Sequence, residues 1–398
     1  MPKPDDIMND EVTDSFGATR QRRAATDGVR PSARLSPMTT SPRYGKASTD
    51  RNRRSRSAFC GCLLGGAVGD ALGAPIEFAS LAEICTRHGP SGVTDLVDGC
   101  WPAGSITDDT QMTLFTAEAL IRGKHRFLDQ GLASASGMAR PSYLRWLATQ
   151  GETVGADVKT GWLVTVPGLH ARRAPCNTCL SALLAGGHGT PANPRNDSKG
   201  CGGVMRIAPV GLALDEPFRT ASEFAAVTHG HPTGHLAAAY LAQLVRELSR
   251  GADLRDAALH ATRPLHAAKG SEETLRAVKG ALLLATHARG TAEEVESLGG
   301  GWVAEEALAI GLFCALVARD FEHGVLLAAN HGGDSDSTGS IAGNLLGLLV
   351  GEEGIPDRWL RRLELRDVIT RVADDLWTCF GETAAPEASA DVEKYPPY

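Results

Sequence analysis

Residues 61–78 read GCLLGGAVGDALGAPIEF, a run in which small residues are interspersed with leucine and valine. The run contains neither the GxGxxG pattern of dinucleotide-binding folds nor the GxxxxGKS or GxxxxGKT pattern of P-loops. It indicates instead a helix whose small residues let another segment pack closely against it. We expect that helix to end near Gly73-Ala74-Pro75, because glycine commonly terminates helices and proline cannot continue them.

The rest of the globular sequence is also predicted to be helical. Stretches 233–250, 272–286 and 302–319 are rich in alanine and leucine, which are strong helix formers. No set of β-branched residues alternates with period two between turn residues, and no βαβ pattern is present. One amphipathic helix is indicated by apolar residues at helical spacing, namely Leu365, Val368, Ile369, Val372 and Leu376. The sequence therefore predicts an all-α fold with one large domain over residues 58–381.

The two ends of the chain differ in composition from this domain. Residues 1–57 contain two lysines and ten arginines against seven acidic residues, a net charge of +5, with few aliphatic side chains. We expect a flexible basic extension there, because such a segment cannot bury enough apolar surface to fold alone. Residues 382–398 are rich in alanine, glutamate and proline and are expected to form a disordered tail.

Bulk properties exclude several classes of protein. A net charge of −7 over 398 residues argues against a general nucleic-acid binder. No run of about 18 apolar residues predicts a transmembrane helix, so no membrane partner is expected. The nine cysteines lack the spacing of a disulfide framework, and the N-terminus lacks the apolar segment of an export signal. These features favour a reducing, cytoplasmic location.

Two short clusters of acids and hydroxyls are the strongest chemical signal. They are Thr107-Asp108-Asp109-Thr110 and Asp334-Ser335-Asp336-Ser337-Thr338. Oxygen-only ligand sets suit hard cations such as Mg²⁺ or Mn²⁺, so two such clusters can hold a pair of ions. Each cluster also precedes an apolar helical run, so helix capping is the alternative interpretation. An EF-hand is excluded, because the twelfth position counted from Asp334 is Leu345 rather than glutamate.

Four further features are weaker alone. Asp70 and Glu77 are isolated acids in the small-residue run, and a surface or capping role is their plain interpretation. The glycine-rich stretch 196–206 lets backbone amides approach an anion, or is an ordinary loop. His229 and His231 flank Gly230, but the sequence positions no third His or Cys ligand beside them. One CxxC pair, Cys176 and Cys179, has no second pair, so buried thiols are favoured over a zinc site.

Five segments in this order resemble the ADP-ribosylglycohydrolase family, and the resemblance covers about residues 58–381. They are GCLLGGAVGDALGAPIEF (61–78), SITDDTQMTL (105–114), NDSKGCGGVMRIAPVG (196–211), THGHP (228–232) and HGGDSDSTGSIAGNLLG (331–347). The resemblance implies an all-α fold with a binuclear Mg²⁺ site at the base of a cleft for ADP-ribose, with Mn²⁺ as the other candidate ion.

The resemblance also implies roles for individual residues. Asp109 and Glu77 are the expected catalytic acids, and Glu77 matches a family acid near the metals. Ser337 occupies a position where several members of the family have threonine. A serine at this position resembles the branch of the family that acts on ADP-ribosylated arginine. The expected metal ligands are Thr107, Asp108, Asp109, Asp334, Asp336 and Ser337. The expected substrate contacts are Ser198, Gly200, Gly202, Gly203 and His229, with the loop cradling the phosphates and ribose.

The function implied is hydrolysis of ADP-ribosylated arginine on proteins, which releases ADP-ribose and the free arginine side chain. Residues 1–57 are similar in placement to the extension of immunity proteins that neutralise interbacterial ADP-ribosyltransferase toxins. Those proteins both hydrolyse the modification and insert the extension into the toxin's active site. Two alternatives stay open: a non-catalytic binder that neutralises a toxin, and a hydrolase of another linkage such as ADP-ribosyl-serine or an O-acetyl ester.

Overall fold

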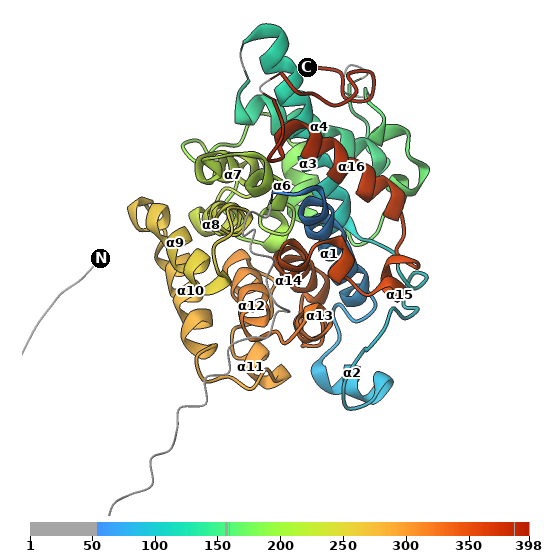
Figure 1. Cartoon of the computed structure of the whole chain (residues 1–398), viewed down its shortest axis with the longest axis vertical. Helices are drawn as coiled ribbons and strands as arrows, with labels where there is room; N and C mark the ends of the chain where they lie inside the picture. The colour runs from blue at the N-terminus through green and yellow to red at the C-terminus, as the bar shows by residue number, and fades with distance from the viewer. Residues whose placement is uncertain (1–53, 132, 156–157, 159, 386, 398) are drawn as a thin grey trace, which may run out of the picture. The chain divides into compact units, whose positions relative to one another are not determined.

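The computed structural model describes residues 54–397 except 132, 156–157, 159 and 386. This part of the chain is helical, contains two isolated β-bridges and forms no strand (Figure 1), as the sequence predicts. The α-helices are α1 (Arg56–Gly73), α2 (Leu81–His88), α3 (Asp108–Gln130), α4 (Ala135–Thr149), α5 (Asn177–Leu184), α6 (Ala208–Ala213), α7 (Pro217–Ala226), α8 (Pro232–Ser249), α9 (Leu254–Ala267), α10 (Glu272–Leu284), α11 (Ala292–Glu296), α12 (Ala304–Val317), α13 (Phe321–Ala329), α14 (Ser335–Val350), α15 (Asp357–Leu360) and α16 (Arg366–Phe380). Short 3₁₀ turns are η2 (Leu163–Thr165), η3 (Pro167–His170), η4 (Cys201–Gly203) and η5 (Glu352–Gly354).

The helices predicted from composition and spacing are all present. The stretches 233–250, 272–286 and 302–319 correspond to α8, α10 and α12, and the amphipathic pattern around 365–376 corresponds to α16. Helix α1 ends at Gly73, where the sequence predicts its end. Within the glycine-rich stretch 196–206, Gly202 and Gly203 lie in the 3₁₀ turn η4.

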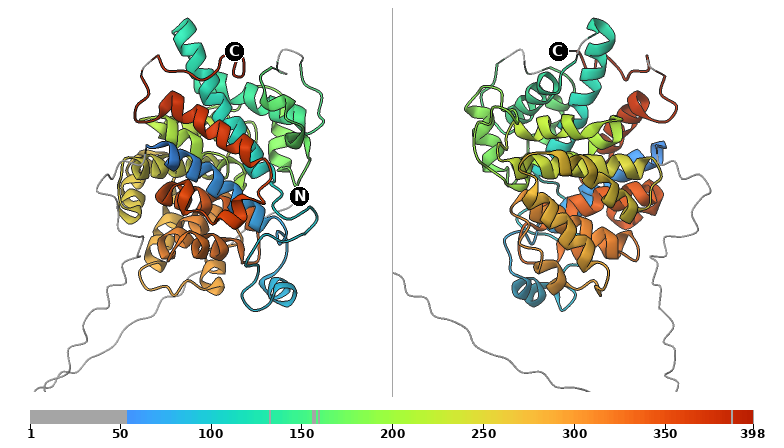
Figure 2. Two further views of the ribbon diagram at one scale, coloured as in Figure 1. Left: turned by 45° about the vertical axis from the view of Figure 1, so that its right-hand side comes forward. Right: turned by 90° about the vertical axis from the view of Figure 1, so that its left-hand side faces the viewer.

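Helices α1 and α14 pack antiparallel with their backbones in direct contact, and α1 lies between α14 and α16 (Figure 2). A Cβ atom on Gly65 would lie 2.3 Å from the carbonyl oxygen of Gly343, and one on Gly69 would lie 2.0 Å from that of Gly339. The same contact continues to Gly73, where a Cβ would lie 2.2 Å from the Ser335 carbonyl oxygen. Only glycine fits these positions, because real Cβ atoms do not approach a carbonyl oxygen so closely. The C-terminal end of α1 is therefore held against the first turn of α14.

Contacts near the start of α1 extend the folded region slightly before the predicted boundary at residue 58. The side chain of Ser55 caps α1 by accepting a hydrogen bond from the Ala58 amide at 3.3 Å. Arg56 forms an ion pair with Asp374 at 2.7 Å, and the indole of Trp377 donates to the Arg54 carbonyl at 3.1 Å. The expected flexible extension, residues 1–57, lies outside the described residues up to position 53.

The C-terminal segment, for which composition predicts a disordered tail over residues 382–398, makes specific contacts with the helical domain. Tyr395 is fully buried, its hydroxyl donates to the Asp375 carboxylate at 2.9 Å, and its ring meets Trp162 edge-on. The His125 ring also forms a 2.6 Å hydrogen bond with the Tyr395 carbonyl. Composition averages over a segment, whereas a single buried aromatic residue with satisfied polar groups can anchor it. Among the described residues, no helix combines the length and apolar character needed to cross a membrane.

Replacing Gly65 with alanine tests the close contact between α1 and α14. The added methyl group collides with the Gly343 backbone, so we expect the free energy of unfolding to fall by about 1–3 kcal/mol. The matched control is Gly280→Ala in α10, where a Cβ meets nothing within 4 Å. That control should stabilise the protein by about 0.5–1 kcal/mol, because alanine favours helix. Equal effects of the two substitutions in urea unfolding would contradict the packing described.

Candidate metal centre and cleft

A cleft of about 280 Å³ lies where the starts of α3, α5 and α14 meet the segment after α1. Its wall combines acids, small polar groups, thiols and two aromatic rings. The described residues that line it are Glu77, Phe78, Asp108, Asp109, Ala174, Pro175, Cys176, Asn177, Thr178, Gly200, Cys201, Met205, Trp302, Asp334, Asp336 and Ser337. Five of the six residues expected to bind metal therefore line one cleft. The sixth, Thr107, is fully buried and is not part of its wall.

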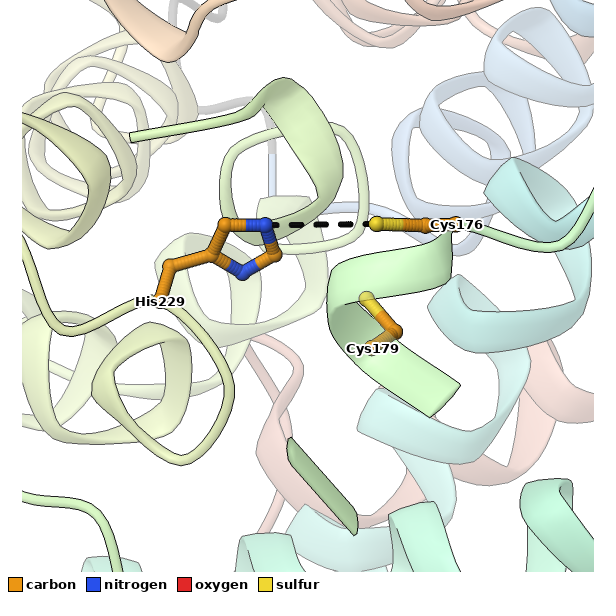
Figure 3. A group of neighbouring side chains, drawn as sticks. All are labelled: Cys176, Cys179 and His229. Atoms are coloured by element: carbon orange, nitrogen blue, oxygen red, sulfur yellow. Dashed lines mark hydrogen bonds between the residues drawn. The ribbon is translucent and has the colours of Figure 1, made fainter. Parts of the chain in front are cut away.

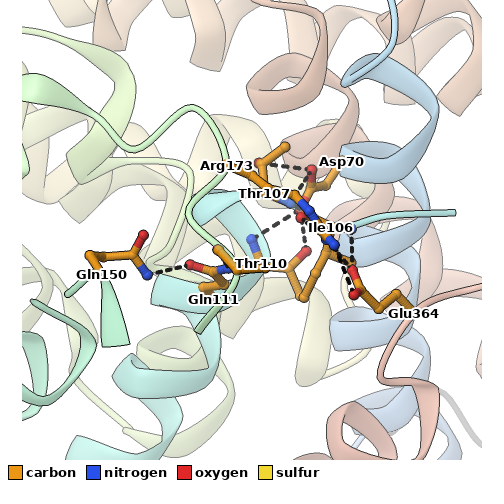
Figure 4. Close-up of polar contacts among 9 residues, drawn as sticks. Asp70, Ile106, Thr107, Thr110, Gln111, Gln150, Arg173 and Glu364 are labelled. Carbon is orange, nitrogen blue, oxygen red and sulfur yellow. Dashed lines mark hydrogen bonds and ion pairs between the residues drawn. The ribbon is translucent and has the colours of Figure 1, made fainter. Parts of the chain in front are cut away.

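The first acid cluster forms the opening turn of α3, and other groups cap that helix. Thr107 is the N-cap, and its hydroxyl accepts a hydrogen bond from the Asp109 amide at 3.3 Å. Asp70 of α1 accepts hydrogen bonds from the Thr107 amide at 3.0 Å and the Thr110 amide at 3.2 Å (Figure 4). The amides of Thr107, Asp109 and Thr110 therefore have partners other than Asp108 and Asp109. The carboxylates of Asp108 and Asp109 are not needed to cap the helix.

A salt bridge braces the chain just before this helix. Arg173 pairs with Glu364 and donates to the Ile106 carbonyl at 3.0 Å, while Glu364 accepts from the Ile106 amide at 3.1 Å (Figure 4). Both polar groups of the Ile106 backbone are thus satisfied by side chains from distant segments. The α3 start is held from two sides, by Asp70 and by this pair.

The second acid cluster forms the start of α14. Asp334 occupies the N-cap position, but its side chain makes no capping hydrogen bond and instead accepts from the Cys201 thiol at 2.8 Å. Asp336, in the first turn, accepts from the Ser337 amide at 3.0 Å. The Ser337 hydroxyl reaches the Asp109 carboxylate at 3.4 Å, which links the two clusters directly. The capping interpretation therefore fails for Asp334, and its carboxylate faces the cleft.

Burial and mutual repulsion make these acids costly to ionise without a counter-ion. Burial, followed by the charge of Asp336, raises the pKa of Asp70 to about 7 and that of Glu77 to about 10. Burial also raises the pKa of Asp109 and Asp336 well above the usual range, with neighbouring carboxylates adding to the effect. No lysine or arginine is among the described residues that line the cleft. A set of buried carboxylates without protein cations is the arrangement that a bound cation stabilises.

The residues present fit a hard divalent cation. Carboxylate oxygens of Glu77, Asp334 and Asp336 lie within 4.8 Å of one another. The Oδ1 atom of Asp109 is buried and has no hydrogen-bond partner among the described residues, so it is available as a ligand. Thr107 donates its hydroxyl proton to Asp70 at 2.9 Å, which leaves an oxygen lone pair for a cation. Carboxylate and hydroxyl oxygens are the ligands that Mg²⁺ and Mn²⁺ prefer.

The expected substrate loop is only partly on the cleft surface. Gly200 lines the cleft, whereas Ser198 lies beside it and its hydroxyl contacts that of Thr178 at 3.2 Å. Gly202 and Gly203 are buried within η4. His229 is fully buried, and its ring faces the Cys176 thiol rather than the open cleft.

Two features of the cleft have no counterpart in the expectations from sequence. Phe78 and Trp302 stack at its mouth with ring centroids 5.1 Å apart, and both rings are largely exposed. Phe78 has φ +67°, an unfavourable value for a residue with a Cβ, which turns its ring toward Trp302. Cys176 and Cys201 line the same cleft. Trp302 is 224 positions from Phe78, so no local sequence pattern could have paired them.

Comparisons with known proteins agree with this architecture. The sequence model of the ADP-ribosylglycohydrolase family matches residues 50–386. The chain is 30% identical over 343 residues to an uncharacterized protein of Archaeoglobus fulgidus, covering 80% of this chain and 95% of that protein. It is 26% identical to the ADP-ribosyl-dinitrogen reductase glycohydrolase of Rhodospirillum rubrum, covering 77% and 90%. It is also 26% identical to the ADP-ribosylarginine hydrolase Tri1 of Pseudomonas putida, covering 80% and 77%.

A solved structure is similar over nearly its whole length. It is described as an ADP-ribosylglycohydrolase-related protein complex, and the superposition has a TM-score of 0.59 at 29% identity. The alignment covers 82% of this chain and 98% of the other.

Stabilisation by Mg²⁺ should increase with pH. In the metal-free protein the pKa of Asp70 is raised from 3.8 to about 7, so the folded state holds a proton that the unfolded state releases. The stability contributed by this group is present below about pH 4 and is lost as the pH rises through about 7. A cation that replaces the protons should therefore raise the unfolding temperature more at pH 7.5 than at pH 5.

The control for this measurement is Asp336→Asn, which removes the charge that contributes most to the raised pKa values of Asp70 and Glu77. We expect that variant to be more stable than the parent without metal and to lose most of the Mg²⁺ effect at pH 7.5. A Mg²⁺ effect that is independent of pH, or unchanged in the variant, would argue against the site.

Proposed function

The chain belongs to the ADP-ribosylglycohydrolase family, and we propose that it hydrolyses the N-glycosidic bond of ADP-ribosylated arginine on proteins with two Mg²⁺ or Mn²⁺ ions bound in the cleft. The observation that carries this proposal is the meeting of two acid clusters, 107–110 and 334–338, in one cleft with an unpartnered Asp109 oxygen. The proposed ligands are Thr107, Asp108, Asp109, Asp334, Asp336 and Ser337.

Arginine as the linked side chain is supported by the shape and charge of the cleft mouth. The guanidinium group is cationic, planar and able to stack on aromatic faces. The stacked rings of Phe78 and Trp302 lie beside the acid Glu77, so an arginine entering there meets both an aromatic surface and a carboxyl group. Two relatives at 26% identity have names that specify ADP-ribosylarginine. A serine linkage or an O-acetyl ester carries no positive charge with which to use these features.

Proton transfer is assigned to the two acids that the cleft leaves available. Breaking the bond to arginine develops positive charge on the ribose and requires an activated water. Divalent ions held by these ligands would orient the ribose hydroxyls and would make water easier to deprotonate. With Oδ1 of Asp109 available as a metal ligand, we assign its other oxygen, Oδ2, to accept the proton of the attacking water. Glu77 is half-buried beside Phe78, and in the metal-free protein burial and the charge of Asp336 raise its pKa to about 10. We assign it to donate a proton to the leaving guanidine.

The remaining assigned contacts concern the rest of the substrate. Gly200 is the loop residue on the cleft surface, and we assign it to the ribose or phosphates. The Ser198 hydroxyl lies behind this loop, where it accepts a hydrogen bond from the Gly200 amide at 3.3 Å and contacts the Thr178 hydroxyl at 3.2 Å. Gly202, Gly203 and His229 are buried, so they contact the substrate only if the loop moves. We assign them a role in holding the shape of the loop.

Turnover of defined linkages tests the proposal. With Mg²⁺, the protein should release ADP-ribose from ADP-ribosyl-arginine faster than from ADP-ribosyl-serine or O-acetyl-ADP-ribose. Asp109→Asn should lower kcat by at least about 100-fold, the scale of a lost general base, while leaving the fold intact. The matched control is Asp357→Asn at the exposed first position of α15, which should keep full activity.

Three outcomes would change the proposal. Preference for the serine or ester substrate would move the activity to another linkage. Full activity of Asp109→Asn with Mg²⁺ present would contradict the site. No turnover of any of the three substrates would favour the alternative of a non-catalytic binder.

A toxin partner is the second part of the proposal. We infer that residues 1–57 bind a cognate ADP-ribosyltransferase toxin. Their net charge is +5, whereas the rest of the chain carries −12, since the whole chain carries −7. The structure indicates where a deletion that tests the role of the extension should end. Arg54 and Ser55 contact the folded domain, so the deletion must stop at residue 53.

Deleting residues 1–53 should weaken toxin binding at least tenfold in a calorimetric titration and leave hydrolysis of ADP-ribosyl-arginine unchanged. A longer deletion through residue 57 should also lower stability, by about 1 kcal/mol for the lost helix cap. Unchanged toxin affinity after the shorter deletion would refute a role for the extension.

A further inference from the structure

Two thiols and an imidazole converge beside the cleft, outside the oxygen-rich site. Cys176 is the N-cap residue of α5, Cys179 lies in the first turn of that helix, and His229 follows α7 (Figure 3). The sulfur atoms and a ring nitrogen of His229 all lie within 4.8 Å of one another. The Cys176 sulfur is 4.0 Å from Nε2 of His229. The sequence separates His229 from Cys176 by 53 positions, so only the fold brings them together.

The spacing suits a small tetrahedral cation. With metal–sulfur and metal–nitrogen bonds of about 2.3 and about 2.0 Å, a tetrahedral ion holds its sulfur and nitrogen ligands roughly 3.6 Å apart. The observed 4.0 Å requires a shift of a few tenths of an ångström, which side-chain rotation supplies. By contrast, no carboxylate is part of this group, so a hard cation such as Mg²⁺ has no preference for it.

Surrounding groups orient the three side chains as ligands. Nδ1 of His229 is 2.8 Å from the Thr228 hydroxyl, which also lies 3.4 Å from the Ala225 carbonyl. If the ring donates through Nδ1 and the threonine donates to Ala225, the Nε2 lone pair faces the sulfurs. Such a second hydrogen bond is usual for a metal-binding histidine. Buried Arg206 contacts both sides of the group, at 2.8 Å from the Thr228 hydroxyl and 3.2 Å from the Cys179 sulfur.

Gly202 leaves room at the centre of the group. A Cβ atom at this position would lie 2.9 Å from the Cys176 sulfur, 3.0 Å from the Cys179 sulfur and 2.9 Å from the His229 ring. That point is almost equidistant from all three side chains, and any residue larger than glycine would fill it. The position is reached from the cleft, because Cys176 is part of the cleft wall.

We propose that Cys176, Cys179 and His229 form a binding site for a soft divalent cation of the Zn²⁺ class, with water as the fourth ligand. Binding replaces the two thiol protons with one ion, so two protons are released and no redox step occurs. The ion would fasten the start of α5 to the turn before α8. Because the Cys176 amide donates to the Asp108 carboxylate at 3.0 Å, the same ion would also steady a residue of the oxygen-rich site.

Co²⁺ is the probe that separates this site from the oxygen-rich one, since thiolate ligands give Co²⁺ an intense near-ultraviolet charge-transfer absorption and oxygen ligands do not. Metal-free full-length protein, reduced with a phosphine and saturated with Mg²⁺, would be titrated with Co²⁺. We expect the absorption to saturate at one equivalent per chain and to be abolished by one equivalent of Zn²⁺. Absence of any thiolate absorption would overturn the proposal, including the case in which Cys176 and Cys179 have formed a disulfide with each other despite the reductant.

Two serine variants locate the sulfur ligands. Cys179→Ser should reduce the absorption and weaken Co²⁺ binding at least tenfold, whereas Cys201→Ser, which alters the thiol beside Asp334, should leave both unchanged. The reverse result would place the ion with Asp334 and overturn the proposal. Should Cys179→Ser fail to fold, X-ray absorption of the Zn²⁺-loaded parent decides. Two sulfur neighbours at about 2.3 Å support the site, and a shell of only oxygen and nitrogen refutes it.

Discussion

The backbone contact between α1 and α14 is the constraint on which the site depends. Because Gly65, Gly69 and Gly73 lie against the carbonyl oxygens of α14, the two helices run closer than side chains would allow. The contact ends where α14 begins, so Asp334 and Asp336 emerge beside the C-terminal end of α1. Asp70, one turn before that end, then holds the first turn of α3. Three helix ends are thereby fixed around one cleft. The starts of α3 and α14 contribute acids to it, and the segment after α1 contributes Glu77.

The helix ends are capped mainly by groups other than the cleft carboxylates, which explains how so many acids can share the cleft. Amides of α3 are satisfied by Thr107 and Asp70, and Asp334 accepts from a thiol rather than from its own helix. The carboxylates are therefore positioned by the helices without being neutralised by them. No lysine or arginine is among the described residues of the cleft wall, and burial raises the pKa values of Asp109 and Asp336. These carboxyl groups therefore favour the protonated form in the folded protein, and a bound metal ion can take the place of the protons. Packing, capping and electrostatics thus all favour a bound metal cation in the cleft.

Much of the fold was predictable from the sequence, because helices rich in alanine and leucine, such as α8 and α12, follow from local propensity. The acid clusters were recognisable because their ligand atoms are adjacent in the chain. What the sequence could not give were contacts that depend on tertiary placement. Asp70 acts as a cap for a helix 37 positions away, and His229 meets Cys176 and Cys179 only after α5 and α7 pack. Tyr395 was missed for the related reason that one anchoring residue does not change the composition of a tail.

The central claim is that α3 and α14 together hold a pair of divalent ions in the cleft. Its most direct test is the anomalous scattering of Mn²⁺ in crystals of the protein grown with the ion and ADP-ribose. The account predicts two Mn²⁺ peaks, contacted by carboxylates of Asp108 or Asp109 on one side and of Asp334 or Asp336 on the other. Peaks that contact only one of these helices, or no peak in the cleft at saturating Mn²⁺, would contradict it.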